Sequence, residues 1–177
     1  WKMDKSYRKE VTIQLEEPKT VANPPGYGIL REEEEAAVQS YISGGSYTLN
    51  AKLRDGLELS DYEQEMADAL DAAIKKLPVY EGTVLRLLDF NHADLVKFAK
   101  GHQIGDTVTY PAFTSSSTAE GYHESPSVIL HIQSKSGRDL RIYNAKEQEI
   151  LFSRNTSFKV LDEYLKDGIM HIHMEEI

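Results

Sequence analysis

The chain has 177 residues, of which 40% are hydrophobic, so it is long enough for one domain with its own core and too short to expect two. Its 29 acidic and 20 basic side chains give a net charge of -9, which argues against nucleic acid or an anionic membrane as the default partner. The sequence has no cysteine, which excludes a disulfide framework, a thiolate nucleophile and a cysteine-rich zinc site. Because the net charge is negative, any anionic ligand must be held by a few local arginines.

Residues 1–28 show no regular apolar pattern and contain the break Asn23-Pro24-Pro25-Gly26. We predict that they form an arm or a linker remnant ahead of a single domain at residues 29–177. The chain begins at Trp1, without an initiator methionine, an apolar secretory segment or any long apolar run. We therefore expect an excised or processed piece of a soluble protein.

Three helices are predicted in the first half of the chain. The first begins at Arg31 with four glutamates, which suit the positive end of a helix dipole, and ends at a pair of glycines. The second, residues 47–54, places Asn50 and Arg54 on one face, where both could bind a ligand. The third begins with a capping box at Ser60. Its apolar residues then recur at helical spacing: Tyr62, Met66, Leu70, Ala73, Ile74 and Leu77.

Residues 79–88 are predicted to form a strand in which Arg86 interrupts an apolar run. An arginine at such a position turns to an edge or reaches a carboxylate or a phosphate. A short helix is predicted at 91–100. The further predicted strands are 107–113, 128–132, 139–143, 147–152, 158–165 and 169–174, with a turn at 166–168 between the last two. Helices first and strands after predict an α+β domain.

Glu147 and Glu149 stand two residues apart at the start of the predicted 147–152 strand. Because side chains alternate along a strand, both carboxylates should point to the same face. The apolar residues that follow can be buried and would hold the carboxylates at the leading edge. Paired carboxylates there suggest acid–base or cation-stabilising chemistry, whereas the alternative is the solvated face of an edge strand.

Two further groups of polar residues stand out. Five consecutive hydroxyls run from Thr114 to Thr118, and a serine-rich turn that bonds to its own backbone is the simple explanation. The loop after them carries Tyr122. His171 and His173 share a strand face with Glu175, but zinc sites favour wider spacing across elements, so we expect no metal there.

Three motifs follow one another in the order and approximate spacing of a known set of signatures: Arg86, Phe113-Thr114-Ser115-Ser116-Ser117 and Glu147-Gln148-Glu149. Together they resemble the Arg-Ser-Glu class of mono-ADP-ribosyltransferases, the clostridial-toxin-like group. The segment from Asn50 to Arg54 is similar to the family's Asn-x-x-Leu-Arg element, and the likeness covers residues 29–177. Ser116 stands where the family usually has threonine, and residues 143–146 look short for its acceptor-recognition loop. The resemblance implies two facing antiparallel β-sheets with flanking N-terminal helices.

The resemblance also implies NAD+ as co-substrate, without a metal, and a role for each site residue. Glu149 would stabilise the oxocarbenium-like transition state, Ser115 would hold Glu149, and Glu147 would face the acceptor, where a glutamate goes with arginine acceptors. The implied catalytic residues are Glu149, Glu147, Ser115 and Arg86. The implied NAD+-binding residues are Asn50, Arg54, Arg86, Leu87, Ser115, Ser117, Tyr122 and Glu149. In this set the backbone of Leu87 would bind the nicotinamide amide and Tyr122 would cover the ring.

The predicted function is therefore mono-ADP-ribosyl transfer to an arginine of a target protein, with release of nicotinamide. The expected setting is a monomeric toxin or effector domain that is secreted or delivered and acts in the cytosol of a target cell. A cognate immunity or chaperone protein is a further candidate partner, whereas a membrane and nucleic acid are not expected. Three alternatives stay open: an NAD glycohydrolase with the same site, an ADP-ribosyltransferase acting on nucleic acid, and a catalytically silent interaction module.

Overall fold

The computed structural model describes residues 27–119 and 126–177. Nearly all of the predicted arm at 1–28, as well as Tyr122, lies outside the described residues. The helices in chain order are α2 (Glu32–Ser40), the π-helical turn η1 (Tyr41–Gly45), α3 (Ser46–Asp55), α4 (Asp61–Ile74) and α5 (His92–Lys100). The strands are β1 (Val79–Leu88), β2 (Thr107–Tyr110), β3 (Thr114–Ser117), β4 (Val128–Asp139), β5 (Glu149–Phe152), β6 (Thr156–Lys166) and β7 (Ile169–Glu176). Within the described ranges, no helix is long and apolar enough to cross a membrane.

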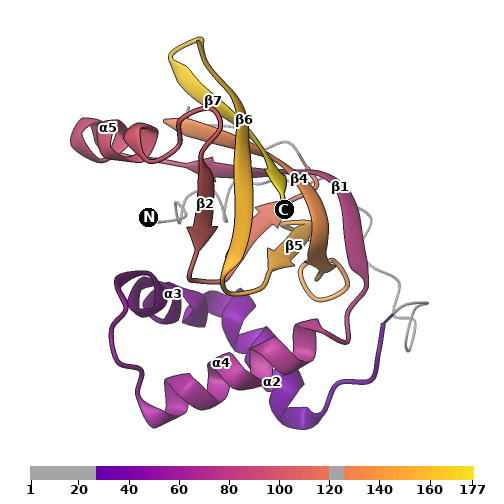
Figure 1. The fold of residues 1–177 in the computed structure, drawn as a ribbon. Helices are drawn as coiled ribbons and strands as arrows, with labels where there is room; N and C mark the ends of the chain where they lie inside the picture. Colours follow the sequence, from indigo (N-terminus) through magenta and orange to yellow (C-terminus); the bar gives the residue numbers. More distant parts are fainter. Residues whose placement is uncertain (1–26, 120–125) are drawn as a thin grey trace.

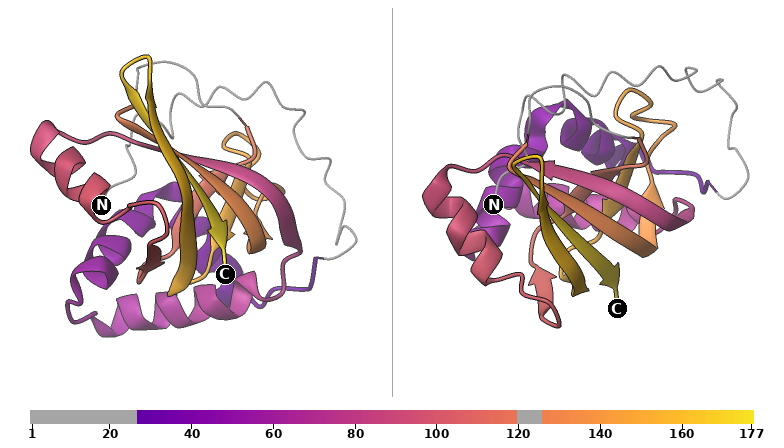
Figure 2. Two further views of the ribbon diagram at one scale, coloured as in Figure 1. Left: turned by 45° about the horizontal axis from the view of Figure 1, so that its top comes forward. Right: turned by 90° about the horizontal axis from the view of Figure 1, so that it is seen from above.

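Helices α2, α3 and α4 gather on one side of the strands, whereas α5 lies apart from them (Figures 1 and 2). The predicted capping box begins α4: Ser60 Oγ accepts from Glu63 N at 3.2 Å, and Glu63 Oε1 accepts from Ser60 N at 3.0 Å. Five of the six apolar residues predicted on this helix face are buried: Met66, Leu70, Ala73 and Ile74 on α4, and Leu77 just after the helix ends. The prediction is wrong for Tyr62, which is 69% exposed. This side chain stands in the first turn of α4 and lines a hollow between α2 and α4 instead of entering the core.

The turn η1 separates α2 from α3 at the predicted pair of glycines. Gly44 has φ 114°, a conformation that L side chains rarely adopt, and a Cβ on Gly45 would lie 2.6 Å from Ser40 Oγ. The two glycines therefore let the chain change direction within one turn. As a result Tyr41, which opens η1, is fully buried beneath the strands.

All seven strands are hydrogen-bonded into one network, in the order β1-β3-β5-β4-β7-β6-β2, and β1 also pairs with β4. Strand β4 connects β1 and β5 with β7. It pairs with β1 along almost its whole length, with β7 along its first half and with β5 at Arg138 and Asp139. The predicted α+β class with N-terminal helices beside the strands is confirmed. The sheet arrangement differs from the expected two antiparallel sheets, since the strands are connected and β4 and β7 are parallel.

Several predicted strands change their bounds. The strand expected at 139–143 is wrong, because Asp139 Oδ1 accepts from Arg141 N at 2.9 Å and this local bond favours a turn. Strand β2 stops at Tyr110, earlier than predicted, since Pro111 has no N–H to donate to a neighbouring strand. The β6–β7 hairpin turns at 166–168 as predicted.

Two buried apolar cores lie on the two faces of β5. One core fills the space between helices α2–α4 and the strands and includes Leu151. The other is partly covered by α5 and includes Ile150 and Phe152. Because successive side chains of a strand point to opposite faces, β5 contributes to both cores and all of its residues are buried. Glu149 thus begins a strand that is covered on both faces.

Candidate active site

The hydroxyl-rich strand β3 is buried along its whole length. Ser116 Oγ donates to Ile150 O at 2.8 Å, and Ser117 Oγ donates to Glu147 O at 2.7 Å. One bond is local, since Ala119 N donates to Ser117 Oγ at 3.0 Å. A serine-rich turn bonding to its own backbone explains only that last contact, so β3 is mainly a polar strand that joins other elements.

Tyr41 connects the helices to β3 through its hydroxyl. The Tyr41 hydroxyl lies 2.7 Å from Ser115 Oγ, and Asn50 Nδ2 donates to the same hydroxyl at 3.1 Å. Because the tyrosine oxygen accepts from the amide, its own proton can be donated to the serine. Asn50, predicted to bind NAD+, is therefore linked to Ser115 through one buried tyrosine.

Arg86 reaches the middle of β3. Its side chain is only 3% exposed, and its Nη1 donates to Ser115 O at 2.7 Å. The pairing of β1 with β3 consists of the single residue pair Leu85 and Ser117. Beyond that pair, among the described residues, no pairing joins this edge of β1 to β3. The backbone of Leu87 therefore lies where the two strands part.

Arg54 lines a pocket of about 300 Å³ at the beginning of β3. Burial lowers the pKa of the Arg54 guanidinium, and the nearby charge of Asp55 acts in the opposite direction. In the part of the chain that the structure describes, no acidic side chain forms a hydrogen bond with Arg54. A half-buried cation of this kind is suited to an anionic ligand such as a phosphate.

The two carboxylates of the Glu-x-Glu motif accept hydrogen bonds from the same side-chain amide. Asn144 Nδ2 donates to Glu149 Oε1 at 2.8 Å and to Glu147 Oε2 at 3.1 Å. The predicted reason for their proximity is wrong, because β5 begins only at Glu149 and Gln148 has φ 46°, so Glu147 belongs to a turn. Glu149 is 1% exposed, whereas Glu147 is half-buried. The two carboxylates therefore share a hydrogen-bond donor, and they do not lie side by side on one strand.

The register of β3 and β5 places the serines relative to Glu149. Ser117 stands directly opposite Glu149, and Ser115 stands opposite Leu151. Because strand side chains alternate, Ser115, Ser117 and Glu149 share one face of the sheet. The structure thus brings together Arg86, the two serines and both glutamates, while the predicted bond from Ser115 to Glu149 stays a prediction.

Sequence reasoning missed Asn144 and did not assign Tyr41 to the site. Tyr41 lies near the end of the first predicted helix, and nothing at that position of the sequence indicates that its hydroxyl reaches β3. Asn144 has one signal in the sequence: asparagine favours turns, and it stands five residues before Glu149. That signal predicts a turn but does not indicate where the amide points.

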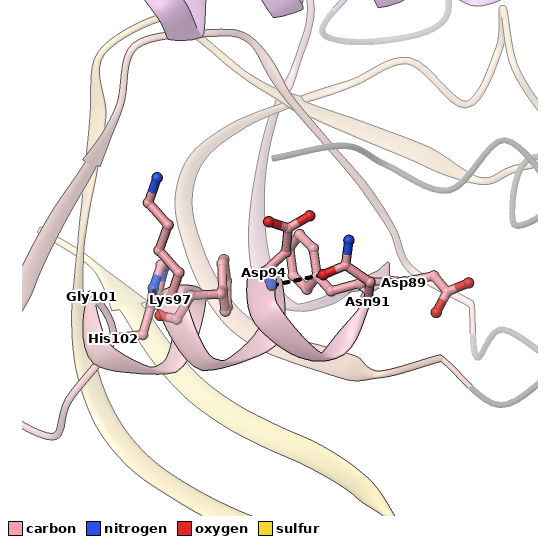
Figure 3. Close-up of a pocket in the computed structure, with 8 residues that line it drawn as sticks. Asp89, Asn91, Asp94, Lys97, Gly101 and His102 are labelled. Carbon is pink, nitrogen blue, oxygen red and sulfur yellow. Dashed lines mark hydrogen bonds between the residues drawn. The ribbon is translucent and has the colours of Figure 1, made fainter.

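A second pocket, of about 520 Å³, lies along α5 and the segment leading into it (Figure 3). Its labelled polar side chains include Asp89, Asp94, Lys97 and His102, and the dashed line marks the helix cap from Asn91 Oδ1 to Asp94 N at 2.8 Å. Among the described residues, none of those predicted for the site lines this pocket. The predicted site residues Arg86, Ser115, Ser117 and Glu149 lie instead on β1, β3 and β5.

Three histidines form a stacked cluster on adjacent strands. His131 of β4 lies over His173 of β7, with ring centroids 4.2 Å apart and an interplanar angle of 3°, and His131 Nε2 lies 2.9 Å from His171 Nδ1. Tyr164 of β6 stacks on His171 and its hydroxyl lies 3.0 Å from His173 Nε2. Among residues 27–119 and 126–177, no group of three His, Cys, Asp or Glu side chains is arranged to hold a metal ion.

The arrangement of strands and helices is that of bacterial ADP-ribosyltransferase toxins. The Vis toxin of Vibrio splendidus has a TM-score of 0.65 at 21% identity, over 88% of this chain and 77% of that structure. The C3 exoenzyme of Clostridium limosum has a TM-score of 0.70 at 15% identity, over 84% and 86%. The expected ADP-ribosyltransferase fold is confirmed.

The sequence assigns the family. Residues 5–176 match the model of the ADP-ribosyltransferase exoenzyme family, and the chain belongs to that family. A Mycobacterium avium protein described as a putative NAD(+)--arginine ADP-ribosyltransferase is 35% identical over 76% of this chain, which spans 16% of that relative. The NAD(+)--protein-arginine ADP-ribosyltransferase Tre1 of Serratia proteamaculans is 25% identical over 84% of this chain, which spans 33% of that relative.

Proposed function

We propose that the chain is an NAD+-dependent mono-ADP-ribosyltransferase that modifies an arginine of a target protein. The observation that carries this proposal is the pair of carboxylates that accept from the amide of Asn144: Glu149 begins β5 and shares a sheet face with Ser115 and Ser117, and Glu147 lies in the turn just before it. Family membership and the names of the two sequence relatives support it.

The reaction needs two separate anions. The bond between C1′ of the ribose and the nicotinamide nitrogen breaks, and nicotinamide leaves with the electron pair. Glu149 accepts a hydrogen bond from the ribose 2′-hydroxyl and stabilises the positive charge that develops on the ribose. A guanidinium nitrogen of the acceptor then bonds to C1′ and loses a proton, which Glu147 accepts. Because a guanidinium is charged at any ordinary pH, an anion such as Glu147 is needed both to position it and to deprotonate it.

The diphosphate of NAD+ needs local cations, because the net charge of the chain is -9. Arg54 is half-buried beside a pocket, and Arg86 is buried against β3. We assign the diphosphate to these two guanidiniums and the nicotinamide amide to the backbone of Leu87, with Asn50, Ser117 and Tyr122 completing the NAD+ site. The proposed reaction needs no metal ion.

We assign the chain to a monomeric toxin or effector domain that is secreted or delivered and acts in the cytosol of a target cell. The support is the exoenzyme family to which the chain belongs and the likeness of its fold to the toxin Vis. Its partner is then a target protein with a reactive arginine, and a cognate immunity or chaperone protein is a second proposed partner.

The two glutamates provide the test. Glu149→Gln should abolish both arginine labelling and NAD+ hydrolysis, because both pass through the same transition state. Glu147→Gln should lower labelling by a general-base-sized factor of roughly 10²–10⁴ and leave most hydrolysis intact, since water needs less help. Nicotinamide release and labelling of lysate proteins are measured side by side. Equal loss of both activities in Glu147→Gln would refute the division of roles, and hydrolysis without any labelling in the unaltered protein would indicate a glycohydrolase.

A further inference from the structure

The amide of Asn144 occupies a position that no motif of the sequence indicates. Asn144 is 8% exposed, and its side-chain nitrogen donates to one oxygen of each glutamate of the Glu-x-Glu motif. The backbone of Asn144 is fixed independently, because its N–H donates to Leu140 O at 2.8 Å. The side-chain amide is therefore not needed to close the turn that carries it.

The chemistry of an amide suits this place. Two carboxylates that approach each other repel, and each must also give up contact with water when it is buried. A single NH2 group has two protons and can donate one to each carboxylate. An aspartate at the same position would have the same shape but no proton to donate at neutral pH, and it would bring a third negative charge.

We propose that Asn144 is a positioning residue that holds the carboxylates of Glu147 and Glu149 together in the orientation required for ADP-ribosyl transfer. This inference rests on the proposed function for its consequence, but its structural part does not depend on activity. Asn144 donates to the two glutamates, and among the described residues no hydrogen bond joins it to Arg54 or Arg86. Because Glu149 also belongs to the proposed NAD+ site, we expect the loss of the amide to lower turnover more than the affinity for NAD+.

The test compares Asn144→Ala and Asn144→Asp with Asn155→Asp. Asn155 is exposed, so the last variant adds the same charge on a surface turn away from the carboxylates. With agmatine as a small guanidinium acceptor, we expect Asn144→Ala to lower kcat for transfer by about 10-fold or more, with a smaller change in KM for NAD+. Asn144→Asp should lower kcat for transfer more than Asn144→Ala does, and Asn155→Asp should keep the kcat of the unaltered protein.

Three results would overturn the inference. One is an Asn144→Asp variant with unaltered kcat. Another is a loss of kcat in Asn144→Ala that is matched by a loss of folded protein in circular dichroism, since that indicates a structural role. The third is independent of activity: in a crystal structure of Asn144→Ala we expect the Glu147 side chain to turn away from Glu149, and an unmoved pair refutes the role of the amide. If the unaltered protein neither labels agmatine nor releases nicotinamide, the proposed function fails, and the crystal structure still decides whether Asn144 holds the carboxylates.

Discussion

Replacing His131 by phenylalanine should flatten the pH dependence of stability. Partial burial and the neighbouring His173 and His171 lower the pKa of His131 from 6.5 to about 4. Below pH 6.5 the unfolded chain therefore takes up a proton on this residue, while the folded chain does so only near pH 4. The unfolded state binds more protons in this window, so the free energy of unfolding falls as the pH falls from 6.5 towards 4.

The magnitude follows from the size of the shift. A shift from 6.5 to about 4 corresponds to about 3 kcal/mol if it is fully expressed. Because the ring of His131 is only half-buried, solvent screens the interaction, and we expect about 1–2 kcal/mol. The groups that face the cluster are Tyr164 of β6, His171 and His173 of β7, and, near His171, Lys166 and Asp167 of the hairpin turn.

Urea denaturation of both proteins at pH 7 and pH 5 measures the effect. Between pH 7 and pH 5 we expect the free energy of unfolding of the unaltered protein to fall by about 1–2 kcal/mol more than that of His131→Phe. The carboxylates titrate in both proteins, so their contribution cancels in the difference. The matched control is His92→Phe, which removes an exposed histidine outside the cluster. Parallel pH dependences of the unaltered protein and His131→Phe would refute the reasoning.

Three further changes test the binding site, a helix cap and the packing around β5. Arg86→Ala should weaken NAD+ binding by about 10-fold or more, since a charge-assisted contact of about 1.5–3 kcal/mol is lost; unchanged affinity in calorimetry would reject the assignment. Ser60→Ala should lower the free energy of unfolding by about 1 kcal/mol in urea, because it removes the cap of α4. Gly137→Ala should lower it by about 1–3 kcal/mol, because the new Cβ would lie 2.6 Å from Ser134 Oγ and 2.7 Å from Ile150 Cγ2; an unchanged urea midpoint would show that the backbone can shift.

The helices were more predictable than the polar turn, and the reason is the range of the interactions. The capping box at Ser60 and the apolar spacing after it depend on residues three or four positions apart, so they can be read locally. The hydrophobic run around Arg86 likewise predicted a strand. The parallel pairing of β4 with β7 joins segments about forty residues apart, and no local pattern specifies it.

The candidate site was predictable in its residue types but not in its geometry. Alternation along a strand would have placed Glu147 and Glu149 side by side, yet the left-handed conformation of Gln148 breaks that strand. The carboxylates share the amide of Asn144, which reaches them from a bend closed at Leu140. Such an arrangement depends on side-chain direction in an irregular segment, which spacing in the sequence does not record.

Because β5 lies between two cores, the two carboxylates differ in how firmly their backbone is held in place. Glu149 is anchored to a strand covered on both faces, so moving it requires disrupting the interior of the domain. Glu147 sits on the turn before that strand, so we expect its displacement to require only local opening. Under the proposed division of roles, the turn at 140–148 can accumulate substitutions that change the acceptor while the residue that cleaves NAD+ stays in place. Acceptor choice and bond cleavage are then separable in evolution, and amide hydrogen exchange should find the turn opening far more often than β5.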